Sequence, residues 1–89
     1  MIRRYAPEFI KALKKKDVRT RKAFKEKIAI FAKDPQDPRL RNHKLKREYK
    51  GFRSIDITHD YRALYTEKSE GDEIVAYFEE VGTHKELYG

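Results

Sequence analysis

The sequence contains no cysteine. Disulfide bonds and thiolate chemistry are therefore excluded, and with them the small secreted scaffolds that depend on disulfides. It also has no apolar run close to the roughly 20 residues that span a membrane, and residues 1–6 are too few and too charged for a signal peptide. These absences lead us to expect a cytoplasmic protein that does not associate with membranes.

Several kinds of catalytic site are missing as well. None of the three histidines has metal-ligand spacing with another histidine, and the signature of a zinc site is absent. Neither a phosphate-binding glycine loop nor a nucleophile elbow is present. We therefore expect no metal and no cofactor, and the enzymes that remain are those that need only positioned acids, bases and cations.

Basic residues, in contrast, are abundant. The chain has 22 Lys and Arg against 15 Asp and Glu, a formal net charge of +7. Charge of this sign raises the local concentration of polyanions and speeds their encounter. Charge alone would suit nucleic acid, an acidic protein or an anionic membrane, and of these we expect the first two as partners. The 89 residues include 6 Tyr and 5 Phe, more aromatic residues than disordered chains have, so we predict a single folded domain over residues 1–89.

The first half of the chain predicts a short strand over residues 2–6 and two helices. Pro7 suits the first turn of the first helix because its missing N–H has no partner there. Asp17 can cap the second helix, which ends at Asp34 because Pro35 disfavours helical geometry for the residue before it. Apolar residues recur on one face of this second helix at Phe24, Ile28 and Phe31.

The second half predicts three strands in a meander. Its pattern of β-branched, aromatic and turn residues gives strands at 52–57, 61–66 and 73–81, with turns at 58–60 and 69–72. Gly82 is expected to end the last strand. The predicted fold class is α+β, with two N-terminal helices packed on one face of a small antiparallel sheet. The other face is left for function.

Histidines at positions 43, 59 and 84 are candidates for acid–base chemistry. RNA supplies its own nucleophile, the 2′-hydroxyl, so a metal-free ribonuclease needs a base, an acid and cations around the phosphorus. Histidine suits both proton transfers because its unperturbed pKa of about 6.5 lies near neutral pH. Each histidine also has a structural interpretation: a solvated loop for His43, turn formation with Asp60 for His59, and a cap on a helical turn over residues 85–88 for His84.

Four short segments stand in order in the second half. They are His43-Lys-Leu-Lys, Tyr49-Lys-Gly-Phe-Arg53, Asp60-Tyr-Arg-Ala-Leu-Tyr65 and Val81-Gly-Thr-His84-Lys-Glu-Leu-Tyr88. In this order, within a short basic chain, they resemble the RelE superfamily of type II toxin–antitoxin systems, and its YafQ-like branch most of all. The resemblance covers residues 39–89.

The resemblance implies a toxin that cuts messenger RNA without a metal, typically on the ribosome, and that an acidic antitoxin holds in check. It implies catalytic roles for four residues: His43, Asp60, His84 and Tyr88. Arg53 and Arg62 match basic strand positions, and we expect both to stabilise charge on the phosphate. We expect three lysines to bind the neighbouring phosphates of the RNA: Lys44, Lys46 and Lys50.

Three positions depart from the YafQ-like pattern. Asp56 stands where that branch has another histidine, and we include Asp56 among the catalytic candidates. An aspartate can act as a base but is a poor acid at neutral pH unless its pKa is raised. Glu79 or Glu80 stands where an arginine is expected. His59 stands where proline is usual, and no role is carried over to it.

Two other functions fit the same sequence. A ParE-like toxin shares the fold but targets DNA gyrase and is not a nuclease, and it would not need His43 or His84. A catalytically inactive RNA- or ribosome-binding module would have the same composition as the enzyme.

Overall fold

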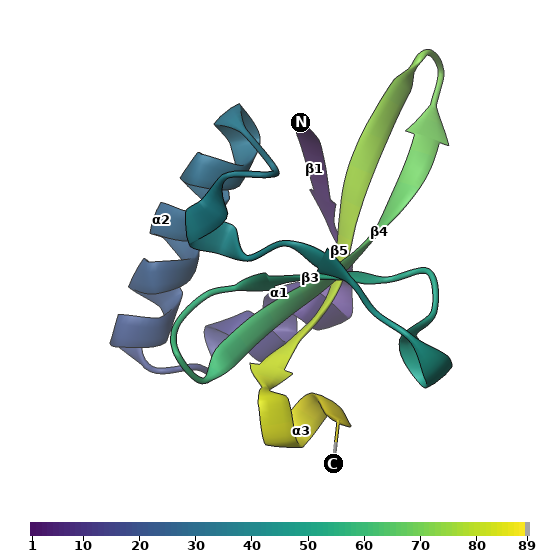
Figure 1. The fold of residues 1–89 in the computed structure, drawn as a ribbon. Helices are drawn as coiled ribbons and strands as arrows, with labels where there is room; N and C mark the ends of the chain where they lie inside the picture. The colour runs from purple at the N-terminus through teal and green to yellow at the C-terminus, as the bar shows by residue number, and fades with distance from the viewer. Residues whose placement is uncertain (89) are drawn as a thin grey trace.

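The structure, a computed structural model that describes residues 1–88, consists of helices packed on one side of a sheet (Figure 1). Its elements in chain order are β1 (Ile2–Tyr5), α1 (Pro7–Lys14), α2 (Val18–Lys33), β2 (His43–Lys44), β3 (Arg53–Asp56), β4 (Tyr61–Glu70), β5 (Glu73–Thr83) and α3 (His84–Tyr88). Short 3₁₀ turns occupy Pro38–Leu40 and Arg47–Tyr49. None of the helices in this described range is long and apolar enough to cross a membrane.

The predicted helices are confirmed, and their ends follow local chemistry. α1 starts at Pro7, and α2 starts after Asp17, whose side chain accepts a hydrogen bond of 2.8 Å from the Thr20 N–H. α2 ends at Lys33 with Asp34 in extended geometry. These ends depend on residues a few positions apart, and for that reason the sequence predicts them well.

The α+β class is also confirmed, but the sheet is larger than the predicted meander. Its strand order is β1-β5-β4-β3-β2. β1 runs parallel to β5, while the other neighbours are antiparallel, so the sheet is mixed and not wholly antiparallel. The parallel pair arises because both helices lie between β1 and the meander in the chain, which allows the crossover that a parallel connection needs.

The β4–β5 hairpin is longer than predicted and rises beyond the rest of the sheet in Figure 1. The predicted turn at residues 69–72 is too wide, since Glu70 pairs with Glu73 and Gly71 has the positive φ of 61° that the tight turn needs.

The predicted break at Gly82 is wrong. Gly82 pairs with Arg62, and β5 continues to Thr83. A Cβ on Gly82 would lie 3.2 Å from Oε1 of Glu86 and 3.4 Å from Cγ of Leu87. The glycine therefore allows α3 to lie close against the end of β5.

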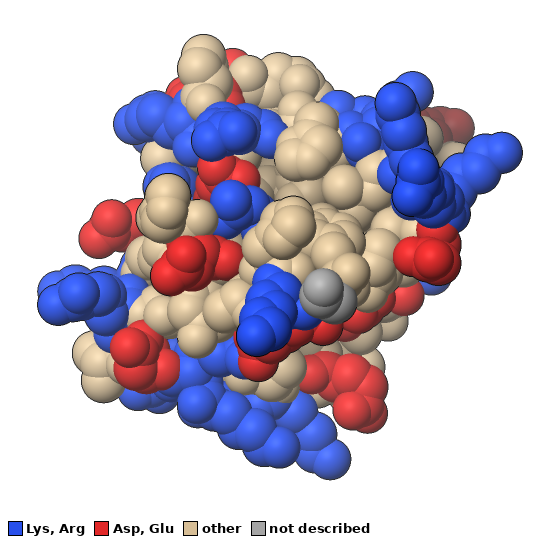
Figure 2. All heavy atoms as spheres, turned by 60° about the horizontal axis from the view of Figure 1, so that its bottom comes forward, with Lys and Arg blue, Asp and Glu red and all other residues tan. Residues whose placement is uncertain are grey.

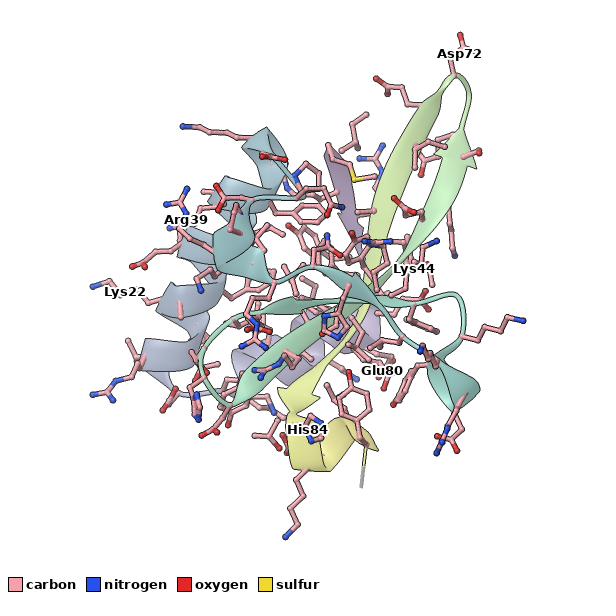
Figure 3. The ribbon with its side chains drawn as sticks, in the orientation of Figure 1. Lys22, Arg39, Lys44, Asp72, Glu80 and His84 are labelled. Atoms are coloured by element: carbon pink, nitrogen blue, oxygen red, sulfur yellow. The ribbon has the colours of Figure 1, made fainter. Side chains whose placement is uncertain are left out.

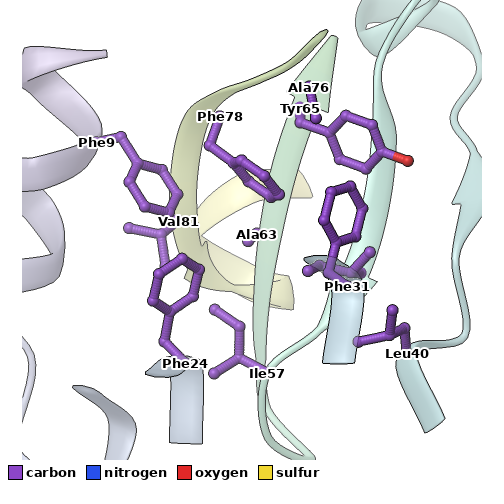
Figure 4. Close-up of a cluster of buried hydrophobic side chains, with 11 residues drawn as sticks. Phe9, Phe24, Phe31, Leu40, Ile57, Ala63, Tyr65, Ala76, Phe78 and Val81 are labelled. Atoms are coloured by element: carbon purple, nitrogen blue, oxygen red, sulfur yellow. The ribbon is translucent and has the colours of Figure 1, made fainter. Parts of the chain in front are cut away.

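The core lies between the sheet and the two long helices, and aromatic rings dominate it (Figure 4). Phe78 of β5 is at its centre, with its ring centroid 5.1 to 6.3 Å from four other buried rings. These four rings are those of Phe9, Phe24, Phe31 and Tyr65. Tyr65 is thus a core residue, and its ring is not available for stacking bases.

Candidate active site

Side chains of β3 and β4 alternate between the two faces of the sheet. Ile55 and Ala63 are cross-strand partners and belong to the core beneath the helices. Their neighbours Ser54, Asp56 and Arg62 therefore point to the opposite face, because successive side chains of a strand point to opposite sides. This is the sheet face that we predicted to be free of helices and available for function.

A cleft of about 410 Å³ lies over this face. It is lined by residues of β2, β3, β4 and α3 together with the segments on either side of β2, so only the fold brings them together. The predicted site residues in the lining are His43, Lys46, Asp56, Arg62, His84 and Tyr88. Arg41, Leu45 and Ser54 complete it.

Asp56 is held between two arginines in this cleft. Its Oδ1 lies 3.0 Å from Nε of Arg62, and its Oδ2 lies 3.6 Å from Nε of Arg41. The Asp56 and Arg62 side chains are only 14% and 18% exposed, while that of Arg41 is 76% exposed. The Asp56–Arg62 pair is thus the shielded part of the arrangement, and the ion pair of Asp56 with Arg41 is exposed to solvent.

The backbone of the β3–β4 turn also holds Arg62. Its Nη1 donates to the carbonyl oxygens of Thr58, His59 and Tyr61, at 3.0, 3.0 and 3.1 Å. The guanidinium is therefore fixed in orientation before any ligand enters. A pre-oriented cation stabilises developing negative charge without the cost of reorganisation.

His43 is an exposed residue of β2 and the cross-strand partner of Ser54. Its Nδ1 lies 2.9 Å from the carbonyl oxygen of Arg41. Because a carbonyl oxygen only accepts, Nδ1 carries the hydrogen in this contact, and Nε2 of the neutral ring is an acceptor. Ser54 is fully buried at the floor of the cleft, and its Oγ has no hydrogen-bond partner among residues 1–88.

His84 is the first residue of α3, and the start of that helix is fixed by a reciprocal cap. The Glu86 N–H donates to Oγ1 of Thr83, and the Thr83 N–H donates to Oε1 of Glu86, at 3.1 and 2.8 Å. The cap residue is thus Thr83 and not His84. The His84 N–H donates to the carbonyl oxygen of Asp60, which joins α3 to the β3–β4 turn. Figure 3 shows His84 at the start of α3.

Aromatic packing holds α3 from its other end. The His84 and Tyr88 ring centroids are 4.6 Å apart, and Tyr88 lies edge-on to Tyr49 at 5.6 Å. The Tyr49 hydroxyl lies 3.1 Å from the carbonyl oxygen of Leu87 and 3.3 Å from Oε1 of Glu80, two acceptors for its single hydrogen. Burial, assisted by the Glu80 carboxylate, raises the pKa of Tyr49, so it remains a donor.

Not every predicted site residue reaches the cleft. Asp60 contributes its backbone carbonyl to His84, but its side chain does not line the cleft. Arg53 pairs with Tyr65 on the helix side of the sheet, and its Nε donates to Oδ1 of Asn42 at 2.9 Å. Lys44 and Lys50 also lie outside the cleft lining.

Sequence reasoning missed Arg41 and Ser54. The only feature of the sequence that could have pointed to Arg41 as a site residue is its charge in the basic stretch that follows Leu40. No feature of the sequence pointed to Ser54. On the last strand, Glu79 accepts a hydrogen bond from Thr66 and Glu80 accepts one from Tyr49. Arg41 brings to the cleft a cation that the last strand does not provide.

The cleft is electropositive. Arg41, Lys46 and Arg62 line it with two histidines, against the single carboxylate of Asp56. Figure 2 shows the α3 end of the molecule, where Lys and Arg side chains, interspersed with Asp and Glu, surround an uncharged centre. Within the described range, no group of three or more His, Cys, Asp or Glu residues could hold a metal ion. The arrangement suits a phosphate group flanked by two imidazoles.

Comparison with known proteins gives one match to a family model, described as "Bacterial toxin of type II toxin-antitoxin system, YafQ", over residues 3–89. No curated protein matches the chain.

Several solved structures share the fold. The Escherichia coli DinJ–YafQ complex contains a chain 26% identical, with a TM-score of 0.65 over 98% of this chain and 97% of that one. YafQ from E. coli strain BL21(DE3) is 25% identical, with a TM-score of 0.66 over the same shares of the two chains. The YoeB/ParE toxin from Agrobacterium tumefaciens is 18% identical, with a TM-score of 0.73 over 94% of this chain and 99% of that one, a likeness of fold alone.

Proposed function

Because the chain belongs to the YafQ family of toxins from bacterial type II toxin–antitoxin systems, we propose that it is an endoribonuclease that cuts messenger RNA without a metal ion. The observation that carries this proposal is the cleft in which two histidines flank a fixed arginine. Such a site has what cleavage by the 2′-hydroxyl of RNA requires, namely a base, an acid and a cation at the phosphate.

In this mechanism His43 is the general base. Its Nδ1 hydrogen is engaged by the carbonyl oxygen of Arg41, which leaves Nε2 to take the proton of the 2′-hydroxyl. The 2′-oxygen then forms a bond to phosphorus as the bond to the 5′-oxygen breaks. His84 supplies the proton to that leaving oxygen. The products are a 2′,3′-cyclic phosphate end and a 5′-hydroxyl end.

Arg62 and Arg41 stabilise the charge that develops on the non-bridging oxygens. Arg62 is held in place by the turn, and the exposed Arg41 can close over the phosphate from the other side. Tyr88 packs against the His84 ring and so positions the acid. Asp60 contributes through its backbone carbonyl, which fixes the start of α3, and not through its carboxylate.

The proposal includes an acidic antitoxin as the partner of this chain. The E. coli DinJ–YafQ complex is a toxin–antitoxin complex. The net charge of +7 of this chain suits an acidic protein as well as RNA. We further propose that the messenger RNA is cut on the ribosome. A ParE-like toxin, the main rival within this fold, would not need histidines on both sides of a fixed arginine.

Cleavage of messenger RNA by the purified protein, with and without translating ribosomes, tests the proposal. His84→Ala is expected to lower the single-turnover rate by roughly 10²-fold or more, the usual effect of losing a proton-transfer group. His59→Ala is the matched control, because His59 offers only its carbonyl oxygen to Arg62. Cleavage should persist in excess chelator. Full activity of folded His84→Ala, or activity that a divalent ion must restore, would refute the mechanism.

A further inference from the structure

The strand β2 has only two residues, and the backbone just before it has an unusual conformation. Arg41 has a φ of 49°, in the left-handed region that residues other than glycine rarely adopt. Such a conformation costs free energy and persists only where the surrounding structure enforces it. The fully buried side chain of Leu40 anchors the chain just before Arg41. Asn42, directly after Arg41, is the second anchor.

The side-chain amide of Asn42 joins three other segments of the chain. Its Nδ2 donates to the carbonyl oxygen of Pro35, in the loop after α2, at 2.9 Å, and to the hydroxyl oxygen of the buried Tyr65 at 2.7 Å. Its Oδ1 accepts a hydrogen bond of 2.9 Å from Nε of Arg53 on β3. A carbonyl oxygen only accepts and a guanidinium only donates, so these partners allow a single orientation of the amide. Asn42 therefore fixes the start of β2 against α2, β3 and β4 together.

The backbone that Asn42 fixes presents two groups to the candidate active site. Nε of Arg41 lies 3.6 Å from Oδ2 of Asp56, and the carbonyl oxygen of Arg41 lies 2.9 Å from Nδ1 of His43. This carbonyl belongs to the peptide group that joins Arg41 to Asn42. A rotation of that peptide group would turn the oxygen away from the imidazole.

The tautomer of His43 depends on this carbonyl. His43 is exposed, and the contact with the Arg41 oxygen is the one hydrogen bond that its ring makes within residues 1–88. The hydrogen bond at one ring nitrogen determines which nitrogen of a neutral imidazole carries the hydrogen. Without the carbonyl, nothing else in this range would hold the hydrogen on Nδ1 and leave Nε2 as an acceptor.

We propose that Asn42 is a positioning residue for the cleft. Its amide holds the carbonyl of Arg41 toward His43 and so keeps Nε2 of that ring as the proton acceptor. The inference rests on the proposed function for the step that Nε2 performs, the removal of the 2′-hydroxyl proton. It also gives Arg53 a role away from the phosphate, since this arginine fixes the amide and does not line the cleft.

The first test measures the tautomer of His43 by NMR of isotope-labelled histidine, in the whole protein without RNA and at a pH where the ring is neutral. The wild-type ring is expected to carry its hydrogen mainly on Nδ1. Asn42→Ala should shift the ring toward the mixture of tautomers that free histidine shows. Gln36→Ala is the matched control, because it removes an exposed amide from the loop that leads to β2 and should leave the tautomer unchanged.

Tyr65→Phe is a second and milder variant. It keeps the buried ring and removes only one of the two acceptors of the Asn42 amide. It should shift the tautomer in the same direction by a smaller amount, and it decides the test if Asn42→Ala does not fold. A wild-type tautomer in folded Asn42→Ala, or in Tyr65→Phe where that is the only folded variant, would overturn the inference.

The second test is the rate of single-turnover cleavage by folded protein. Asn42→Ala should lower the maximal rate by roughly 10-fold or more, since a misplacement of about 1 Å can cost as much as 10²-fold. The RNA concentration that gives half of this rate should change little. In the His43→Ala protein the same substitution should cause much less additional loss, because Asn42 acts through His43. Fully additive losses, or weaker RNA binding as the only effect, would contradict the inference.

The outcome is separable from that of the proposed function, because the tautomer is measured without RNA. A tautomer that depends on Asn42 in a protein that does not cut RNA would leave the positioning role standing and refute the nuclease. Cleavage of RNA by a protein whose His43 tautomer is the same with and without the Asn42 amide would do the reverse.

Discussion

Asp56 carries the only full negative charge in the lining of the candidate cleft, and it lies between Arg62 and Arg41. The YafQ-like pattern that the sequence resembles has a histidine at this position. Here the carboxylate occupies the place where an anion would meet both guanidinium groups. Under the proposed function, a substrate phosphate would therefore share or displace this internal partner as it binds.

Asp56→Asn should tighten binding of uncleavable RNA by about 5-fold. This corresponds to the ~1 kcal/mol with which unit charges some 4 Å apart repel each other in water. Affinity is measured by titration at low salt. Asp60→Asn removes the same charge from outside the cleft and should have a smaller effect. Weaker binding in Asp56→Asn would mean that the carboxylate serves mainly to hold the arginines in place.

At the scale of single elements, α3 is a helix of only five residues, two of which line the cleft. A helix this short is not stable alone and depends on contacts with the rest of the protein. Glu86 is central to them. Its carboxylate accepts a hydrogen bond from the Thr83 N–H and lies 3.8 Å from Nζ of Lys16, in the turn between α1 and α2. The Thr83 N–H, followed by the charge of Lys16, lowers the pKa of the Glu86 carboxyl.

A lowered pKa in the folded state fixes the direction of a pH effect. The contribution of Glu86 is present above the unfolded-state pKa near 4.5 and is lost as the pH falls through the lower folded value. We expect amide hydrogen exchange in α3, corrected for its intrinsic pH dependence, to accelerate on acidification below pH 4.5. In Glu86→Gln, amide exchange in α3 should already be faster at neutral pH, and it should change little on acidification. A wild-type helix equally protected on both sides of this range would contradict the assignment.

At the scale of the whole molecule, the sheet and the helices are joined through Phe78. Its fully buried ring contacts aromatic rings from α1, α2 and β4. Phe78→Ala should lower the free energy of unfolding by about 3–5 kcal/mol, the usual cost of removing a buried phenyl ring. Urea unfolding followed by circular dichroism measures this. Ile74→Ala, at a residue of the same strand that is 51% exposed, should cost far less.

The net charge of +7 also acts at this scale. Binding of single-stranded RNA should weaken with salt, with a slope of about −0.7 in log K against log salt for each phosphate contact. Lys46→Ala should make that slope shallower by about one contact. Lys25→Ala, on the helix layer that covers the other face of the sheet, should leave it unchanged. Equal slopes in all three proteins would show that RNA binds elsewhere.

Much of the fold could be predicted from local patterns. The start of α1 at Pro7, the cap of α2 at Asp17 and its end before Pro35 involve residues a few positions apart. Chemistry at that range determines helix ends almost independently of the rest of the chain. The basic composition and the four family segments are likewise properties of the sequence alone, and they led to the family that the comparisons confirm.

The tertiary structure decided which of these residues meet. Arg53 and Arg62 looked equivalent in sequence, yet the register of β3 against β4 places Arg53 toward the helix side and Arg62 in the cleft. In a strand, a shift of one residue reverses the face that a side chain occupies. Arg41 enters the cleft only because the chain returns from α2 across the sheet edge, and no local pattern predicts that. Pairing between distant segments depends on loop closure and on the shape of the packed core, and these are properties of the whole chain.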